Sequence, residues 1–312
     1  MTASASGPTL WRLPSAAVEV MESLYQHRLL HTGQLHAMHT PQATRRWTQQ
    51  LLRGLARHGL IATARGPGAL KLWYLTETGA EAVEAIPTRA EPRRRLITPE
   101  QAAGQLQAHT LAVNDVGVAF LQAARQCGDE FGPLSWRHEI AHPIGALPGR
   151  HRGELLVADA LLSYVRCDTD DAVLVEQRFV ELDRGTLPVQ ELHAKFTRYQ
   201  RLYRHAPDPP PGEDRVAAWR ASYPSFPEVL VVFAHRPRPA LQRRTQLTIA
   251  LYQSDPELAR ARHPRVRCCQ LEDLQAYGPF APIWLRAEDP GVLVDWLGRP
   301  AEPTSRPQRA GA

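Results

Sequence analysis

The sequence lacks the features of membrane-spanning and exported proteins. No run of eighteen apolar residues occurs, so no transmembrane helix is predicted. The segment Met1–Thr9 is small and polar, without the basic and then apolar stretches of a secretory signal. The four cysteines (Cys127, Cys167, Cys268 and Cys269) show neither zinc-ligand spacing nor a disulfide framework, and indicate free thiols in a reducing compartment. We therefore expect a cytoplasmic protein without membrane contact, whose 312 residues suffice for two domains.

Common catalytic motifs are also missing. The chain has no GxxxxGK[ST] loop, which argues against NTP hydrolysis of the P-loop kind. It has no GxSxG nucleophile elbow and no GxGxxG dinucleotide fingerprint.

Lysine is scarce, and the basic charge is unevenly distributed. Only Lys71 and Lys195 are lysines among 37 basic residues, an arginine bias typical of a GC-rich genome. Residues 1–95 contain twelve basic and six acidic side chains, whereas the other 217 residues contain 25 and 26. The basic excess therefore lies in the first part of the chain, where it favours a polyanionic partner such as DNA.

Residues 15–88 carry the pattern of a winged helix-turn-helix domain. Helices are expected over Ala16–Leu29, over Gly33–Met38 with Thr32 as its cap, and from Thr40-Pro41 to Gly59. Residues 60–63 and 71–75 predict a hairpin with a glycine-rich tip, and Thr76 begins another helix.

The third of these helices is the candidate DNA-recognition helix. We expect Trp47, Leu51 and Leu55 to face the core at four-residue spacing. In a winged helix the third helix enters the major groove and the hairpin touches the DNA backbone or the minor groove. The alternative is a protein-binding module, against which the basic charge argues. The predicted DNA contacts are Arg45, Arg46, Gln49, Arg53, Arg65 and Lys71.

A second domain is expected over residues 99–299, after a basic linker at 89–98 that is a candidate for additional DNA contact. Residues 1–14 and 300–312 are predicted to be disordered. A long helix is expected from Thr98 to Cys127, and the pattern then alternates as an α+β fold with a mixed sheet. The expected strands are residues 134–141, 154–166, 172–183, 228–234 and 266–269, with helices over 188–204 and 239–252.

The order αβββαβ resembles the core of the PD-(D/E)XK nuclease superfamily, which places acidic residues on its second and third strands. Asp159 is a lone charge in an apolar strand, and Glu181 and Asp183 project to the same face of the next strand. The resemblance implies that Asp159 and Glu181 bind Mg²⁺ and that Asp183 assists the metal or the water. Glu139 is a candidate third acid, with a solvent-facing strand position as the alternative.

The lysine of that superfamily is missing from its usual place, which Asp183 occupies. Lys195 lies on the following helix, beside the buried stripe that includes Leu192 and Tyr199. From there its amine can reach over the strand ends and stabilise charge on a phosphate, as in nucleases of this class whose lysine has migrated. The alternative is a surface ion pair with Glu191 at i,i+4 spacing.

The chain as a whole resembles the replication-relaxation family of actinobacterial plasmids and integrative elements over residues 15–285. The segments that carry this resemblance are 51–55, 59–61, 73–79, 109–115, 158–160 and 181–186 with Lys195 and Tyr199. The resemblance implies a role in replication, relaxation or mobilisation of an element's DNA. Relaxases of the commonest type need a His-hydrophobic-His motif, and the sequence has no His-x-His pair.

Other metal-like or nucleophile-like patterns have structural interpretations. We interpret the pairs His36/His39 and His138/His142 as structural or solvent-facing residues. The tyrosines Tyr199 and Tyr203, at helical spacing, are interpreted as core residues.

Three hypotheses remain open. The first is a DNA-binding protein of a mobile element that is also a Mg²⁺-dependent endonuclease or nickase. The second is a catalytically inactive replication initiator or regulator that uses the nuclease-like fold to bind DNA or other replication or conjugation proteins. The third is a winged-helix transcription regulator. The sequence does not set the oligomeric state.

Overall fold

The computed structural model describes residues 13–86, 96–102, 104, 106–145, 154–167, 173–207 and 214–300. Three predicted segments fall largely outside these residues. They are the linker, including the arginines at 93–95, and the two predicted disordered ends, of which only residues 13, 14 and 300 are described. Among the described helices, none combines the length and apolar character that a membrane span needs.

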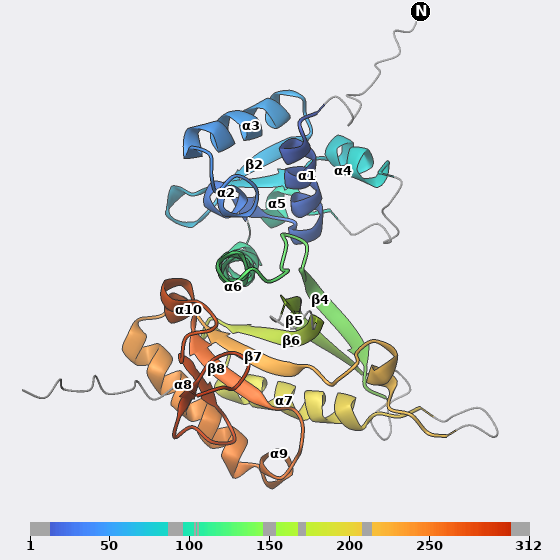
Figure 1. The fold of residues 1–312 in the computed structure, drawn as a ribbon, viewed down its shortest axis with the longest axis vertical. Helices are drawn as coiled ribbons and strands as arrows, with labels where there is room; N and C mark the ends of the chain where they lie inside the picture. Colours follow the sequence, from blue (N-terminus) through green and yellow to red (C-terminus); the bar gives the residue numbers. More distant parts are fainter. Residues whose placement is uncertain are drawn as a thin grey trace, which may run out of the picture.

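The first part of the chain forms four helices around a small antiparallel sheet of strand order β1-β3-β2 (Figure 1). The hairpin prediction is confirmed, since Ile61 pairs with Leu75 and Arg65 with Lys71. Strand β1, which the sequence pattern did not predict, pairs with β3. The elements are α1 (Ser15–His27), β1 (Leu30–His31), α2 (Thr32–His39), α3 (Arg45–Arg57), β2 (Ile61–Arg65), η2 (Pro67–Ala69), β3 (Lys71–Leu75) and α4 (Glu77–Glu84).

The start of α3 differs from the prediction. The helix begins at Arg45 because Thr44 is its N-cap, whose hydroxyl accepts a hydrogen bond from the Trp47 amide. Thr40 instead ends α2, and its hydroxyl bonds to that of Thr48 at 2.6 Å. Likewise, His31 rather than Thr32 caps α2, since its Nδ1 accepts from two backbone amides.

The buried face of α3 is also different from the predicted one. Thr48, Leu52 and Leu55 are buried, whereas Trp47 is exposed and Leu51 is only half-buried. The Thr48 hydroxyl forms hydrogen bonds with the Thr40 hydroxyl and with His36 Nδ1, which makes its burial possible. The helix therefore turns Thr48 towards the core and leaves the neighbouring Trp47, the residue predicted from hydrophobicity, exposed.

The second part is a seven-stranded mixed sheet of order β10-β9-β8-β7-β6-β5-β4. Strands β4, β5 and β6 form the predicted antiparallel meander, and β6 and β7 are the predicted parallel neighbours on either side of a helix. The strands are β4 (Trp136–Pro143), β5 (Leu155–Cys167), β6 (Val173–Asp183), β7 (Glu228–Phe233), β8 (Val266–Gln270), β9 (Trp284–Arg286) and β10 (Leu293–Val294).

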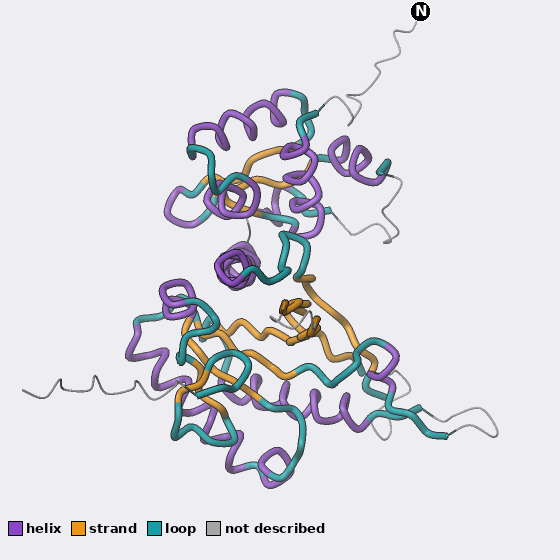
Figure 2. The backbone as a smooth tube through the Cα atoms, in the orientation of Figure 1, coloured by secondary structure: helices purple, strands orange, loops and turns teal. Residues whose placement is uncertain are grey.

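Helices cover both faces of the large sheet, with α6 and α10 on one face and α7 and α8 on the other, whereas α5 packs beside the small sheet (Figures 1 and 2). The predicted long helix is two helices, α5 and α6, with Gly104 between them. Helices α9 and α10 and strands β9 and β10 were not predicted. The helices are α5 (Pro99–Ala102), α6 (Leu106–Cys127), α7 (Val189–Arg204), η3 (Ala218–Ala221), α8 (Arg238–Ser254), α9 (Pro256–Ala259) and α10 (Leu271–Tyr277).

Helix α6 lies between the small sheet and the large sheet and packs against both (Figure 1). One continuous buried cluster contains side chains of α1, α2, α6 and one face of the large sheet, and a second cluster fills the opposite face under α7 and α8. Polar contacts reinforce this junction, because Asn114 on α6 donates to the Leu29 carbonyl and accepts from Trp136 and His138.

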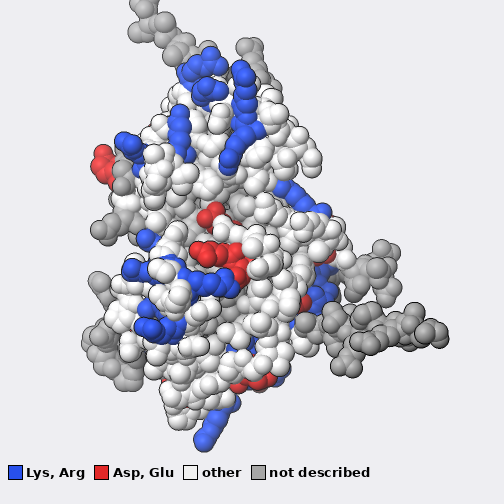
Figure 3. All heavy atoms as spheres, turned by 90° about the vertical axis from the view of Figure 1, so that its left-hand side faces the viewer, with Lys and Arg blue, Asp and Glu red and all other residues white. Residues whose placement is uncertain are grey.

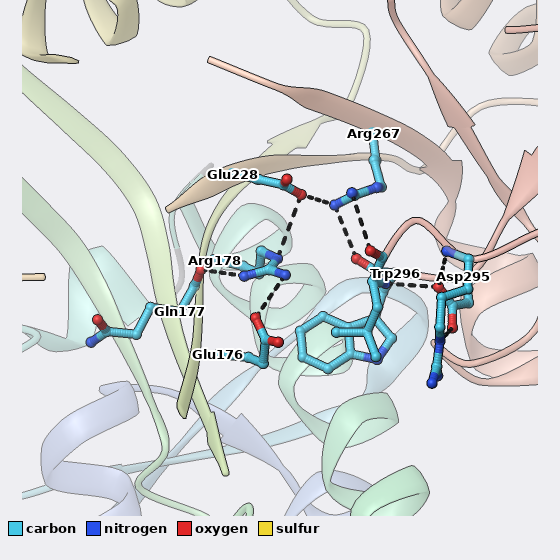
Figure 4. A network of polar contacts seen from close by, with 9 residues as sticks. Glu176, Gln177, Arg178, Glu228, Arg267, Asp295 and Trp296 are labelled. Atoms are coloured by element: carbon cyan, nitrogen blue, oxygen red, sulfur yellow. Dashed lines mark hydrogen bonds and ion pairs between the residues drawn. The ribbon is translucent and has the colours of Figure 1, made fainter. Parts of the chain in front are cut away.

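Two buried arginines fasten the end of the described chain to the large sheet (Figure 4). Arg267 on β8 contacts Glu228 and donates to the carbonyl oxygen of Trp296 at 3.1 Å. Arg178 on β6 pairs with Glu176 at 2.9 Å, and its guanidinium lies 5.2 Å from the centre of the Trp296 ring. Charge pairing and a cation–π contact therefore hold this otherwise irregular segment against the strands.

Candidate functional site

Asp159 lies where β5 parts from β6. The ladder between these strands ends at the pair Ala160–Val180, and the Asp159 carboxylate then accepts a hydrogen bond from the Leu182 amide at 2.8 Å. Ala158 and Ala160 pack in different core clusters, so the alternation of side chains breaks at Asp159. The backbone irregularity therefore aims a carboxylate at the neighbouring strand end instead of into the apolar core.

Lys195 on α7 brings the two predicted metal-binding acids together. Its Nζ donates to Asp159 Oδ1 at 3.2 Å and contacts Glu181 Oε2. Of the two alternatives for this lysine, the structure shows the reach over the strand ends. No ion pair with Glu191 exists among the described residues.

Tyr199, one turn further along α7, completes the cluster. Its hydroxyl donates to Glu181 Oε1 at 2.5 Å, so both oxygens of that carboxyl group have partners. The tyrosine is fully buried, as its helical spacing predicted, but it is also a hydrogen-bond donor to the site. We call Asp159, Glu181, Lys195 and Tyr199 the acid–lysine cluster.

Burial controls the protonation of this cluster. Glu181 is only 2% exposed, and this desolvation, together with the nearby Asp159, raises its pKa to about 8 against the opposing effects of Lys195 and Tyr199. Desolvation lowers the pKa of Lys195, but the attraction of Glu181 and Asp159 outweighs it and leaves that pKa raised. Burial also raises the pKa of Tyr199 well above its usual value, so this hydroxyl remains a donor. Near neutral pH the favoured state is a charged ammonium beside a Glu181 carboxyl group that readily takes a proton.

His109 also belongs to the site, although no role was predicted for it. It lies on α6, and its Nε2 is 3.5 Å from Asp159 Oδ2. Its segment contributed to the family resemblance, but about fifty residues separate it from β5, and local pattern does not reveal such a contact.

Two other predicted acids lie outside the cluster. The Asp183 carboxylate accepts from Arg244 Nε on α8 and from the Gly185 amide, both at 2.7 Å. Glu139 forms an ion pair with Arg28 at 2.8 Å. Asp183 thus lines the same cleft as the cluster with both oxygens engaged, and Glu139 has a partner on another element.

Asp159, Glu181 and Lys195 of the acid–lysine cluster line a cleft of about 600 Å³, and Tyr199 lies buried behind them. Strand β5, the end of β6, the loop that follows it and α7 supply most of its walls, and His109 of α6 and Arg244 of α8 complete them. Figure 3 shows acidic side chains gathered in the middle of this side of the molecule, with basic side chains next to them and others on the part of the chain above.

A second hollow, of about 680 Å³, lies between α3 and β3. We call it the α3–β3 groove. Its basic side chains lack ion pairs with any described residue, and the Nζ of Lys71 lies 4.5 Å from the centre of the Trp73 ring. Arg57 was not predicted as a contact. The groove is lined by Arg46, Gln50, Arg53, Ala56, Arg57, Lys71 and Trp73.

The other predicted DNA contacts lie around this groove. Arg45 and Gln49 are exposed on α3, and Arg65 is exposed at the end of β2. Arg53 Nε donates to the Gln49 carbonyl oxygen at 3.1 Å, which keeps its side chain along the helix.

The histidine pairs have structural partners. His36 bonds to the Thr40 and Thr48 hydroxyls, and His39 to the Ser23 hydroxyl. His142 contacts the Tyr223 hydroxyl at 3.0 Å. In the described part of the chain, no group of three or more His, Cys, Asp or Glu side chains is arranged to hold a metal ion.

Comparison with known proteins identifies the family. No curated protein and no solved structure matches the chain. A family model described as replication-relaxation matches residues 21–212, which include both the α3–β3 groove and the acid–lysine cluster. This match covers more than half of the sequence, and the chain therefore belongs to the replication-relaxation family.

Proposed function

We propose that this protein binds DNA and acts in the replication or relaxation of a mobile element. The observation that carries the proposal is the α3–β3 groove, where four basic side chains that form no ion pair with a described acidic residue line one hollow. Helices α1 to α3 and the β2–β3 hairpin have the order of a winged helix, in which the third helix and the hairpin meet DNA.

The groove suits a phosphate backbone for a physical reason. Unpaired arginines and a lysine that remain in water gain from DNA contact because each neutralised phosphate releases counterions. The exposed Trp47 is on the same helix, where its ring is available to sugars or bases. Family membership supports DNA and replication proteins as partners.

Duplex binding by the full-length chain tests this proposal. The variant Arg46→Ala, Arg53→Ala, Lys71→Ala should bind about 100-fold more weakly near 0.15 M salt, because each lost phosphate contact removes about a fivefold gain. The control is Arg260→Ala with Arg262→Ala, two exposed arginines without a described ion pair in the segment between α9 and β8. Equal affinity of the triple variant and the wild type would contradict the proposal.

A second candidate function is Mg²⁺-dependent cleavage of DNA. The observation that favours it is that one lysine ammonium bridges two carboxyl groups at the floor of a cleft. Carboxylate oxygens are hard donors, and Mg²⁺ in proteins takes one or two of them and keeps several waters, so Asp159 and Glu181 fit the ion. Bound there, Mg²⁺ would lower the pKa of a water and neutralise charge on a phosphate.

The residues of the chain would have separate roles in this reaction. Asp159 and Glu181 would bind the cation, and Tyr199 would orient Glu181 by its hydrogen bond. A cation and the Lys195 ammonium compete for the same oxygens, so the ammonium would pair with a phosphate oxygen once the carboxylates are occupied. His109 would fix the orientation of Asp159.

A nicking assay on supercoiled DNA carrying the element's origin tests the second function. With Mg²⁺ or Mn²⁺, the wild type and the control Glu272→Gln, at an exposed position of α10 outside the cleft, should nick the DNA, whereas Asp159→Asn and Glu181→Gln should not. Duplex binding without cleavage in either metal would reject the endonuclease and favour an initiator or regulator without catalysis.

A further inference from the structure

Exposed aliphatic side chains surround the cleft above the acid–lysine cluster. Leu155 is 56% exposed, Val157 40% and Leu187 63%, and all three line the cleft. Leu155 and Val157 alternate along β5 and lead directly to Asp159. We call these three residues the aliphatic wall. Large apolar side chains gathered at the mouth of a cleft indicate a surface that contacts an apolar partner.

Arg184 and Arg236, which have no described acidic partners, lie where the loop after β6 borders this cleft. Arg184 lines the cleft, and Arg236 donates to the carbonyl oxygens of Arg184 and Gly185 at 3.3 and 3.1 Å. Because these bonds are to the backbone, they leave the charge of Arg236 unneutralised. The loop itself is held in place, since Arg244 donates to the Leu187 carbonyl oxygen at 2.8 Å.

The reactive groups are recessed below these walls. The side chains of Asp159 and Lys195 are 20% exposed, and that of Glu181 is 3% exposed. A phosphate can meet them only if its strand enters the cleft. A duplex presents phosphates on its outside and keeps base faces stacked, so it offers an aliphatic wall little to contact. An unpaired strand offers both a phosphate and a free base face.

We propose that the cleft binds single-stranded DNA, with an unpaired base against the aliphatic wall and adjoining phosphates on Arg184 and Arg236. This inference rests on the proposed DNA-binding function and names the form of DNA that the cleft takes. It also assigns the chain two DNA surfaces, with duplex at the α3–β3 groove and an unpaired strand at the cleft.

Fluorescence anisotropy with the full-length protein in EDTA tests the proposal without cleavage. The probes are a twenty-nucleotide thymidine strand, a strand of equal length with abasic sites, and a duplex. The wild type should bind the thymidine strand about tenfold more tightly than the abasic strand, since burying about 55 Å² of apolar surface between base and wall gives that factor at about 25 cal/mol per Å². Equal affinity for these two strands would overturn the proposal without any substitution.

Two variants separate the base contact from the phosphate contact. Leu155→Thr, Val157→Thr, Leu187→Thr should remove the preference for the thymidine strand and leave the salt dependence unchanged. Arg184→Ala with Arg236→Ala should reduce the slope of log affinity against log salt by about 1.4 for the single strand, at about 0.7 for each phosphate. Arg260→Ala with Arg262→Ala is the charge-matched control.

Duplex binding distinguishes failure of this inference from failure of the proposed function. Both cleft variants should bind duplex within twofold of the wild type, because the α3–β3 groove is intact. If the cleft variants bind the single strand as the wild type does, or lose single strand and duplex equally, the proposal is wrong while groove binding stands. Failure of the wild type to bind duplex would instead contradict the proposed function.

Discussion

Replacing the buried Glu181 with glutamine should change how the stability of the protein depends on pH. Burial raises the pKa of this carboxyl group to about 8 in the folded protein, against about 4.5 in the unfolded chain. The folded state thus holds a proton that the unfolded state has lost. The resulting stabilisation is fully present below pH 4.5, declines as the pH rises towards 8, and is gone above it.

The two pKa values set the size of this effect. Between pH 6 and pH 8 the wild type should lose about 2 kcal/mol of unfolding free energy through Glu181 alone. Glu181→Gln keeps an acceptor for Tyr199 and has no proton to lose, so its profile should be flatter by that amount. Urea unfolding of both proteins in EDTA at pH 6, 7 and 8 measures the difference. Parallel profiles would refute the assignment of a raised pKa to Glu181.

Three further outcomes are expected. Lys195→Met should destabilise the protein by about 3 kcal/mol at pH 9, because Glu181 is ionised there in the wild type and loses the cation that stabilises its charge, and adding Glu181→Gln should recover much of the loss in urea unfolding; equal stability of Lys195→Met and the wild type would count against the pair. If the acid–lysine cluster cleaves DNA, the nicking rate should rise between pH 6 and 8 as Glu181 ionises, and a rate independent of pH would argue against its role as a ligand. Gly79→Ala should cost about 3 kcal/mol although alanine favours helices, because its Cβ would lie 1.9 Å from the Leu60 carbonyl oxygen; a more stable variant would disprove that clash.

The sequence predicted the elements with strong periodicity and missed those without it. The antiparallel meander β4–β5–β6 and its parallel neighbour β7 follow from long apolar strands on either side of a helix. Strands β9 and β10 have only three and two residues. Tertiary contacts support them, such as the hydrogen bond from Arg267 on β8 to the Trp296 carbonyl oxygen just after β10. Such contacts are tertiary, and a local pattern does not contain them.

The residues of the candidate site also divide into those that the sequence pattern predicted and those that it missed. The two acids stand out because each is a charge in an apolar strand, and Lys195 because lysine is rare in this chain. His109 and Tyr199 look like ordinary helix residues, and only the fold places them against Asp159 and Glu181. The prediction that Trp47 is buried was wrong because it relied on hydrophobicity alone. Burying the Thr48 hydroxyl costs little free energy, since it has two hydrogen-bond partners.

In the second part of the chain, the positions of the charged side chains say more about DNA binding than their net charge does. Residues 96–312 are close to neutral, which predicts that duplex affinity depends on the first part. In the structure, however, Asp183 is paired with Arg244 and the Glu181 carboxyl group is buried, while Arg236 is exposed and, among the described residues, bonds to backbone carbonyl oxygens alone. A neutral total therefore hides a locally basic edge of the cleft.

The salt dependence of duplex binding tests the central claim most directly. Log affinity of the wild type for a duplex should fall linearly with log salt, and removal of Arg46, Arg53, Arg57 and Lys71 should reduce the slope by about 3.6, at about 0.9 for each phosphate. The same slope in the wild type and in this fourfold alanine variant would show that the α3–β3 groove is not where the protein meets DNA.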